Sequence, residues 1–263
     1  MIRVAVCGSG QMGSLVLDTV DAQEDMQAVG VLEPVGTHEG EHRLASGATV
    51  GVHATPEELF AAARPDVVVD FTNAAFTPTL VAAATAAGVR LVVGTSGVTD
   101  DTIEVWRKSC ADAGLGGVYA ANFAIGAVLL MHMSTIASKF FDSAEIIELH
   151  HDRKVDSPSG TALSTARLMR EARGRDFEAN EPSLEHLEGA RGAQTGGVPI
   201  HSVRLRGFVA SQEVVFGGQG QTLSLRHDST GRDSFMPGVV LAVREVMQRA
   251  ELVVGLDALV GLR

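Results

Sequence analysis

The sequence predicts an α/β fold in which an N-terminal doubly wound parallel sheet is followed by a second α+β domain with a mixed or antiparallel sheet. Two observations predict this fold. In the first half of the chain, short apolar runs alternate with segments of helical spacing, which is typical of a parallel sheet covered by helices. From Ile200 onward, consecutive strand-like runs replace the helical segments, and the first of them alternates with period two.

Length and composition are typical of a globular protein. The chain has 263 residues, a formal net charge of −11 and two cysteines. The negative charge argues against nucleic acids and anionic membranes as partners. Neither a disulfide framework nor a secretion signal is indicated, so we expect a cytoplasmic protein. The uncharged span Gly114–Ser138 contains polar interruptions, which favours a strand, a loop and a buried helix over a membrane span.

A glycine-rich motif follows the first expected strand directly. The apolar run Ile2–Cys7 leads through Gly8-Ser9-Gly10-Gln11-Met12-Gly13 into an expected helix over Leu15–Val20. In this pattern the first glycine permits a tight turn, the second lets a pyrophosphate approach the backbone, and the third allows close packing of helix on strand. The phosphates would sit at the helix N-terminus. The motif therefore predicts a Rossmann-type dinucleotide-binding domain.

Glu33 ends the second expected strand, 20 residues beyond Gly13. A carboxylate at this place can accept hydrogen bonds from ribose hydroxyls, whereas it would repel the additional phosphate of NADP. The next residue is Pro34 rather than an arginine. NADH is therefore the favoured cofactor, and NADPH is the alternative.

The other elements of the first domain continue the alternation. Residues Pro34–Gly51 are rich in glycine, histidine and charge and are expected to form a loop. Two expected strands end in polar tips, Asp70-Phe71-Thr72 and Gly94-Thr95-Ser96-Gly97, which are either ligand-binding loops or ordinary helix caps. Helices are expected over Pro56–Ala63, Pro78–Ala87 and Asp100–Ala113, and strands over Val67–Asp70, Val89–Val93 and the run closed by Ala120-Ala121-Asn122-Phe123.

The second domain is expected to span residues 124–234, with residues 235–263 returning to the first domain (1–123). Residues Arg173–Gly197 are expected to form a long surface loop, either a lid or a passive insertion. Helices are expected over Ile125–Phe141, from Ser159 onward and over Phe235–Arg249, and strands over Ala144–Leu149, Ile200–Leu205, Val209–Phe216 and Thr222–His227, with Leu252–Leu262 completing the first domain.

The segment Glu148–Ala162 contains the densest group of chemically useful side chains. His150 and His151 lie where a strand ends, and their opposite directions predict different roles. Lys154 adds a positive charge and a proton donor. The first helical turn at Ser159–Thr161 presents free N–H groups, which predict an anion site. Polar loop histidines and an ordinary helix cap are the alternatives, and a zinc site is disfavoured because no third ligand lies at close spacing.

These motifs resemble the family of 4-hydroxy-tetrahydrodipicolinate reductases, long called dihydrodipicolinate reductases, of bacterial lysine and diaminopimelate synthesis. The run Glu148-Leu-His-His-Asp-Arg-Lys-Val-Asp-Ser-Pro-Ser-Gly-Thr161 is similar to the E-x-H-H-x-x-K-x-D-x-P-S-G-T segment of that family. The resemblance extends over nearly the whole chain, and the HHxxK segment is its most specific part.

The resemblance implies an NAD(P)H-dependent reduction of 4-hydroxy-tetrahydrodipicolinate and a homotetramer. It implies that His150 is the acid/base residue and that Lys154 donates a proton. The substrate carboxylates would be held by His151, Gly160 and Thr161, with Ser159 adding a hydroxyl. The nucleotide would contact Gly8, Ser9, Gly10, Gln11, Met12, Gly13, Glu33, Gly94, Thr95, Ser96, Ala120, Ala121, Asn122 and Phe123. No metal is expected.

Departures from the family pattern and two alternative functions complete the expectations. The glycine loop is one residue shorter than the usual GxxGxxG form and has Gln11 where a basic residue is common, which favours NADH. Ser96 replaces a threonine and keeps a hydroxyl.

One alternative is a related dehydrogenase for another imine or a semialdehyde, which is disfavoured because an acylating semialdehyde enzyme needs a nucleophilic cysteine beside a base. The other is a non-catalytic dinucleotide-binding sensor, which would not need His150 and Lys154 together.

Overall fold

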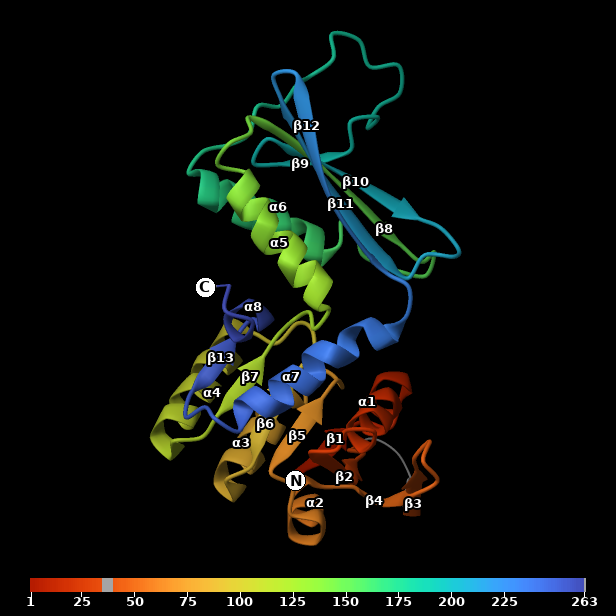
Figure 1. The fold of residues 1–263 in the computed structure, drawn as a ribbon, viewed down its shortest axis with the longest axis vertical. Helices are drawn as coiled ribbons and strands as arrows, with labels where there is room; N and C mark the ends of the chain where they lie inside the picture. Colours follow the sequence, from red (N-terminus) through yellow and green to blue (C-terminus); the bar gives the residue numbers. More distant parts are fainter. Residues whose placement is uncertain (35–39, 263) are drawn as a thin grey trace. The chain divides into compact units, whose positions relative to one another are not determined.

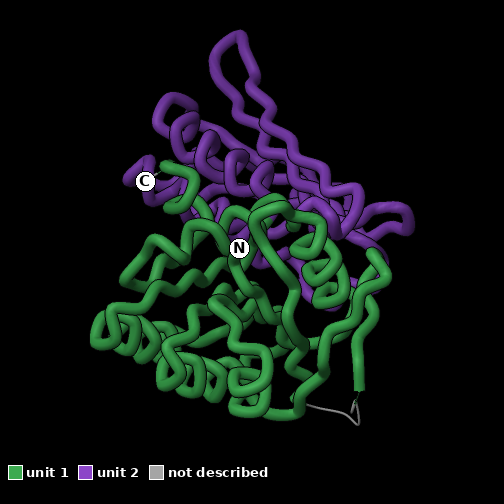
Figure 2. The backbone as a smooth tube through the Cα atoms, turned by 60° about the horizontal axis from the view of Figure 1, so that its bottom comes forward, with its two compact units in different colours: residues 1–123, 235–263 green, residues 124–234 purple. Residues whose placement is uncertain are grey.

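The computed structural model describes residues 1–34 and 40–262, and the chain divides into two compact units (Figures 1 and 2). Unit 1 consists of Met1–Phe123 and Phe235–Arg263, and unit 2 consists of Ala124–Ser234. The first unit is therefore built from both ends of the sequence, whereas the second is one continuous segment.

Unit 1 contains, within the described residues, an eight-stranded sheet in the order β13-β7-β6-β5-β1-β2-β4-β3. Its strands are β1 (Ile2–Cys7), β2 (Met26–Leu32), β3 (Gly40–Arg43), β4 (Thr49–His53), β5 (Val67–Asp70), β6 (Arg90–Val93), β7 (Gly117–Tyr119) and β13 (Leu252–Val254). All neighbouring pairs are parallel except β3 with β4. The predicted doubly wound parallel sheet is confirmed.

Helices bury both faces of this sheet because successive side chains of a strand point to opposite sides. Cys7 of β1 belongs to a core cluster with Leu80 and Trp106, which come from two of the covering helices. Its neighbour Val6 points the other way, toward the helix that contains Gly13. The helices of unit 1 are α1 (Gln11–Asp21), α2 (Pro56–Ala63), α3 (Thr77–Ala87), α4 (Asp100–Ala113), α7 (Met236–Val246) and the short α8 (Leu256–Leu259).

The strand order reverses at β1, which pairs with β2 on one side and with β5 on the other. In open parallel sheets this reversal creates a crevice at the carboxyl ends of the strands. The glycine loop follows β1, Glu33 follows β2, and the Gly94–Ser96 turn follows β6. The fold thus brings the segments predicted to contact a nucleotide to one edge of one sheet.

Unit 2 contains a five-stranded mixed sheet in the order β12-β11-β8-β10-β9. Only β8 and β10 pair in parallel; the other pairs are antiparallel. Two helices cover one face, where Ile146 of the central strand packs with Ala166 and Met169. The elements are α5 (Ile125–Ala137), β8 (Ser143–His150), α6 (Gly160–Arg173), β9 (Ala193–Thr195), β10 (Val198–Arg204), β11 (Ala210–Gly218) and β12 (Gln221–Ser229), and the 3-10 helix η1 (Arg232–Phe235) follows them. The predicted mixed sheet is confirmed.

Three predicted segments differ from the structure. The loop expected over Pro34–Gly51 is wrong in part, because it contains β3 and the start of β4; residues 35–39 lie outside the described residues. The helix expected to reach Phe141 ends at Ala137, and the loop Arg173–Gly197 includes the short strand β9. In the described parts of the chain, we find no helix with the length and apolar character needed to cross a membrane.

Candidate functional site

The glycine loop has the shape that its spacing predicts. Gly8 has a φ of +90°, in the region that favours glycine, and its N–H donates to the carbonyl of Leu32 (2.7 Å). A Cβ at Gly13 would lie 1.9 Å from the carbonyl oxygen of Gly8, so helix and strand approach too closely for any side chain there. A Cβ at Gly10 would meet no atom within 4 Å. The backbone at Gly10 is therefore open to a ligand.

Glu33 lies directly beside this loop. Its Oε2 accepts hydrogen bonds from the N–H (2.8 Å) and the hydroxyl (2.7 Å) of Ser9. Its own N–H donates to the carbonyl of His53 (2.8 Å), which fixes the end of β2 against β4. A carboxylate is thus held at the start of the glycine loop, where it adds negative charge.

Asp70 links the loops that follow β5 and β6. This carboxylate has no exposed surface and accepts hydrogen bonds from the N–H (2.9 Å) and hydroxyl (2.6 Å) of Thr72 and from the hydroxyl of Thr95 (3.1 Å). The acid at the end of β5 therefore positions the neighbouring loops and is not exposed to a ligand.

Aromatic rings lie beside the same strand ends. A Cβ at Gly94 would lie 2.1 Å from the Phe71 ring, whose centroid is 5.5 Å from that of Phe123 in an edge-on arrangement. Of the other predicted contacts, Ala120 is buried, whereas Ala121 and Ser96 are exposed. The ends of β5, β6 and β7 are therefore packed together.

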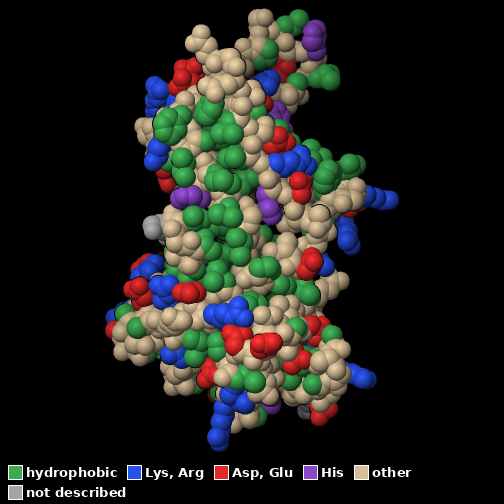
Figure 3. Space-filling view, viewed as in Figure 1, with side chains coloured by type: hydrophobic (Ala, Val, Ile, Leu, Met, Phe, Trp, Pro, Cys, Tyr) green, Lys and Arg blue, Asp and Glu red, His purple; other side chains and the backbone are tan. Residues whose placement is uncertain are grey.

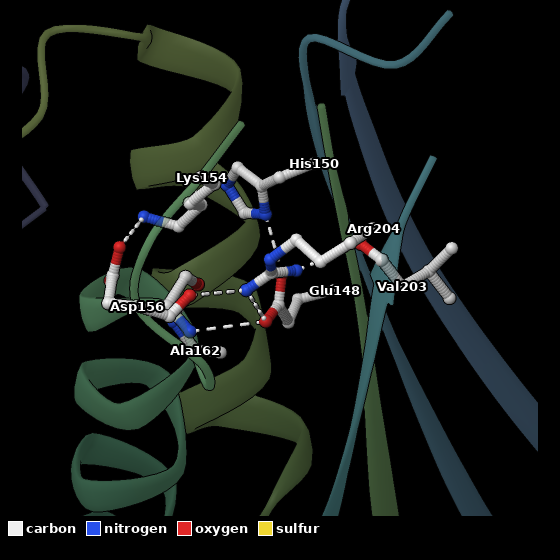
Figure 4. Close-up of polar contacts among 8 residues, drawn as sticks. Glu148, His150, Lys154, Asp156, Ala162, Val203 and Arg204 are labelled. Carbon is white, nitrogen blue, oxygen red and sulfur yellow. Dashed lines mark hydrogen bonds and ion pairs between the residues drawn. The ribbon is translucent and has the colours of Figure 1, made fainter. Parts of the chain in front are cut away.

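In unit 2, His150 is the last residue of β8, and its ring turns back toward Glu148. The even-numbered residues Ile146, Glu148 and His150 share the face of β8 that the helices cover. The Nδ1 atom of His150 lies 2.5 Å from Oε2 of Glu148 (Figure 4). Burial lowers the pKa of the imidazole below its ordinary value, and the hydrogen bond to Glu148 opposes this only in part.

Glu148 is completely buried and pairs with Arg204. The guanidinium donates to both carboxylate oxygens, with Nη1–Oε2 and Nη2–Oε1 distances of 2.8 Å each. Burial by itself would raise the pKa of the Glu148 carboxyl, but the hydrogen bonds from Arg204, Ser202 and His150 hold the pKa below its ordinary value. The carboxylate is therefore ionised at neutral pH.

Lys154 and His151 lie in the loop between β8 and α6. The Nζ atom of Lys154 is 2.6 Å from Oδ1 of Asp156, and its side chain is only 21% exposed. The Nδ1 atom of His151 is buried and has no hydrogen-bond partner in the part of the chain that the structure describes. This nitrogen is therefore enclosed by the protein without a partner there.

The predicted anion site lies at the N-terminus of α6. Ser159 caps the helix, because its hydroxyl accepts from the N–H of Ala162 (3.2 Å), and its own N–H donates to Oε1 of Glu148 (3.2 Å). Within the described residues, the N–H groups of Gly160 and Thr161 make no hydrogen bond. A Cβ at Gly160 would meet open space. Two helix amides are therefore free to bind an anion.

This arrangement combines a neutral imidazole, an ammonium group and an anion-binding helix end in one loop region. It suits proton transfer to or from a small anionic ligand. Among the described residues, no group of three or more potential ligands could hold a metal ion. Both cysteines are buried and free; burial raises the pKa of Cys7 and raises that of Cys110 to about 11, so neither thiol suits nucleophilic attack.

Three supporting residues of this group, Glu148, Asp156 and Arg204, were not predicted from the sequence. Arg204 reaches Glu148 because β10 pairs with β8 in parallel, and the register places Arg204 opposite His150. The only signal was a single basic residue in an alternating strand. Asp156, which binds Lys154, was visible as part of the motif but was given no role.

Comparisons with known proteins cover the whole chain. Residues 2–123 match the family described as dihydrodipicolinate reductase, N-terminus, and residues 126–260 match dihydrodipicolinate reductase, C-terminus. The chain is 42% identical to the 4-hydroxy-tetrahydrodipicolinate reductase of Dehalococcoides mccartyi, with 99% of both chains covered, and 44% identical to that of Geobacillus kaustophilus, with 97% of this chain and 98% of the other covered.

Solved structures show the same likeness. A dipicolinate-bound dihydrodipicolinate reductase from Paenisporosarcina sp. TG-14 superimposes with a TM-score of 0.87, at 42% identity over 98% of this chain and 99% of the other. An amine dehydrogenase from Mycobacterium smegmatis, with a TM-score of 0.66 and 14% identity over 97% of this chain and 95% of the other, shares the fold alone.

Proposed function

Because the chain belongs to the dihydrodipicolinate reductase family, we propose that it reduces 4-hydroxy-tetrahydrodipicolinate to tetrahydrodipicolinate with NAD(P)H, in lysine and diaminopimelate biosynthesis. The observation that carries this proposal is the grouping of His150, Lys154 and the free amides of α6 in a chain that matches these reductases over its full length. A diacid substrate needs such an anion site, and its reduction needs a proton source.

The residues of the loop after β8 divide the chemistry among them. His150 exchanges a proton at Nε2, because its Nδ1 faces Glu148. Lys154 gives a proton that quenches the charge left on the ring after reduction and loss of water. The partly exposed imidazole of His151, the hydroxyl of Ser159 and the amides of Gly160 and Thr161 bind the substrate carboxylates.

The carboxyl edge of the sheet in unit 1 binds the nucleotide. The residues present fit a dinucleotide, because the loop bends at Gly8, leaves open space at Gly10 and begins the helix α1. When bound, the reduced nicotinamide supplies the hydride. The binding residues are Gly8, Ser9, Gly10, Gln11, Met12, Gly13, Glu33, Gly94, Thr95, Ser96, Ala120, Ala121, Asn122 and Phe123.

NADH is the preferred cofactor in this proposal. Glu33 is fixed beside Ser9, where its carboxylate can accept hydrogen bonds from ribose hydroxyls. The same negative charge repels the 2′-phosphate of NADPH. The exposed Gln11 adds no positive charge that would compensate.

A homotetramer and a cytoplasmic location complete the proposal. In unit 2 the helices cover one face of the sheet, while residues of the other face, such as Ile147, Leu149 and Val215, remain partly exposed within the described chain. Such a face favours association with further copies. Leu129, Met133, Ile136 and Phe140 form an exposed apolar row on and just after α5, which adds to this tendency. Apolar side chains are also visible on this face of the molecule in Figure 3. The two free cysteines suit a reducing compartment.

A dehydrogenase for a semialdehyde is not favoured. Its acylating chemistry needs a reactive thiolate, and burial raises the pKa of both Cys7 and Cys110. A non-catalytic sensor would have no need for His150 and Lys154 together, and the full-length relatives are reductases.

The test is a coupled assay with both cofactors in parallel. The condensation product of pyruvate and aspartate semialdehyde is added to the purified chain, and loss of reduced-nicotinamide absorbance is followed. We expect rapid loss with NADH, slower loss with NADPH, and competitive inhibition by dipicolinate. The matched controls are the chain without substrate and the variant His150→Gln. No oxidation with either cofactor would contradict the proposed reaction, and faster oxidation of NADPH would contradict the cofactor preference.

A further inference from the structure

The carboxylate of Glu148 receives a full set of hydrogen bonds inside unit 2. Arg204 Nη1 and His150 Nδ1 face its Oε2 (Figure 4). Arg204 Nη2 and the N–H of Ser159 face its Oε1. A carboxylate has about four acceptor positions, and these four nitrogens together with the side chain of Ser202, which also hydrogen-bonds it, fill them. Because the side chain is also fully buried, Glu148 has neither surface nor acceptor capacity left for a substrate.

The charge of Arg204 decides which way the proton lies between Glu148 and His150. A bidentate guanidinium stabilises the ionised carboxylate, so Glu148 can only accept from the imidazole. The Nδ1 atom of His150 must then be the donor. In a neutral ring this leaves Nε2 without a proton. Burial lowers the pKa of the ring, and the positive charges of Lys154 and Arg204 act in the same direction, which keeps the ring neutral near pH 7.

We propose that Glu148 and Arg204 form a positioning pair that holds His150 in the Nδ1-protonated tautomer and presents Nε2 as the atom that exchanges a proton. This inference rests on the proposed function, in which His150 is the acid/base residue. Neither member of the pair touches the substrate in this assignment. They act through the orientation and tautomer of the imidazole, as a buried carboxylate does for a catalytic histidine in other folds.

The same pair also sets the position of the rest of the site. Arg204 Nη2 donates to the carbonyl of Asp156 (2.7 Å), and Asp156 in turn binds Lys154. The N–H of Ser159 fixes the start of α6 on Glu148. The pair of Glu148 and Arg204 therefore holds the imidazole, the loop that contains the ammonium group and the helix end that presents free amides.

The variant Glu148→Gln tests this assignment because an amide has one oxygen and one NH2 group. If the oxygen faces Ser159, the NH2 group meets one donor of Arg204 and faces Nδ1 of His150. If it is reversed, the NH2 group meets two donors, Arg204 Nη2 and the N–H of Ser159. The first orientation brings fewer donors face to face, and it requires Nδ1 of His150 to accept a hydrogen bond from the NH2 group. The variant therefore forces the opposite tautomer, with the proton on Nε2.

We expect kcat of Glu148→Gln to fall at least about a hundredfold, with KM changed by less than about threefold, because general acid–base contributions are of that size. The matched control is Glu145→Gln. Glu145 lies on the same strand and also has a histidine and an arginine as partners, His201 and Arg191, but it makes no contact with His150. The kcat of Glu145→Gln should stay within about twofold of that of the unmodified chain, since this change lies outside the site.

Nitrogen NMR of histidine-labelled protein reads the tautomer directly. In the unmodified chain, we expect His150 to show a protonated Nδ1 and an unprotonated Nε2, with the signal assigned by its loss in His150→Gln. In Glu148→Gln the pattern should invert, and in Glu145→Gln it should not change. This measurement needs no substrate, and on the unmodified chain it decides the inference even if Glu148→Gln does not fold.

Three results would overturn the inference: a protonated Nε2 in the neutral ring of the unmodified chain, an unchanged tautomer in folded Glu148→Gln, or an unchanged kcat. A failure of the proposed function is distinguishable from these. In that case the unmodified chain itself would not reduce the substrate, while the NMR pattern would still show whether Glu148 and Arg204 fix the ring.

Discussion

Two neighbouring glycines of the same loop should respond to a methyl group in opposite ways. In Gly13→Ala the new Cβ would lie 1.9 Å from the carbonyl oxygen of Gly8 and 2.8 Å from its carbonyl carbon. To reach a contact of 3.0 Å the backbone must move by about 1.1 Å, the difference between 3.0 and 1.9. In Gly10→Ala the Cβ meets no atom within 4 Å, and the backbone φ of −68° suits any residue.

The sizes of two opposing effects decide whether Gly13→Ala stabilises or destabilises the fold. Replacing a helical glycine by alanine normally stabilises by about 0.5–1 kcal/mol, whereas overpacking against backbone costs about 1–3 kcal/mol. Because Gly8 is held to Leu32 by a hydrogen bond, it cannot move freely, and the cost should lie near the upper end. We expect a net loss of about 2 kcal/mol, or a decrease in melting temperature of about 4–8 °C.

Thermal unfolding and NADH titration separate the two variants. Gly13→Ala should lose stability and nucleotide affinity together, because the loop itself is displaced. Gly10→Ala should keep its melting temperature within about 1 °C, since a surface change costs little. It should nevertheless bind NADH at least about tenfold more weakly, which corresponds to about 1.4 kcal/mol. An unchanged affinity in Gly10→Ala would refute the phosphate-binding role of the loop, and an unchanged melting temperature in Gly13→Ala would refute the packing argument.

Three further variants test other parts of the molecule. Lys154→Ala should reduce kcat at least about a hundredfold in steady-state assays, while the exposed control Lys139→Ala should not, and equal rates would remove Lys154 from the proton transfer. Glu33→Ala should weaken NADH far more than NADPH in binding titrations; equal losses would contradict the ribose assignment. Burial lowers the pKa of His227 below its ordinary value of about 6.5. Between these two pKa values the unfolded chain binds more protons than the folded chain, so the folded state loses stability as the pH falls through this window. His227→Gln should therefore flatten the rise of melting temperature as the pH increases toward about 6.5, and an unchanged slope would contradict the assignment.

The parts of the site that were predictable are local in the sequence. His150, Lys154 and Ser159 lie within ten residues, so a strand, a loop and a helix start are enough to bring them together. Arg204 was not predictable, because its contact with Glu148 depends on which strands pair and in which register. That pairing is a property of the whole sheet and leaves no periodic mark on either strand.

Two errors in the predicted elements have the same kind of cause. The strand β3 was taken for loop because it lies at the sheet edge and three of its four residues are exposed, so it lacks an apolar pattern. The predicted helix over residues 125–141 was too long, since α5 ends at Ala137 and the apolar Phe141 is not part of it. Phe141 instead packs on Phe216 of β11, with ring centroids 5.6 Å apart. Tertiary packing, which a local pattern does not contain, decided both cases.

Because unit 1 is made from both ends of the sequence, its assembly has an order during translation. The strand β13 adds to the sheet beside β7, and Gly238 of α7 packs so closely on the carbonyl of Phe123 that a Cβ there would lie 2.1 Å away. The ribosome must therefore release residues beyond Val254 before the nucleotide-binding half can close. All strands of unit 2 are synthesised before β13, so unit 2 can complete its sheet while β7 still lacks its outer neighbour.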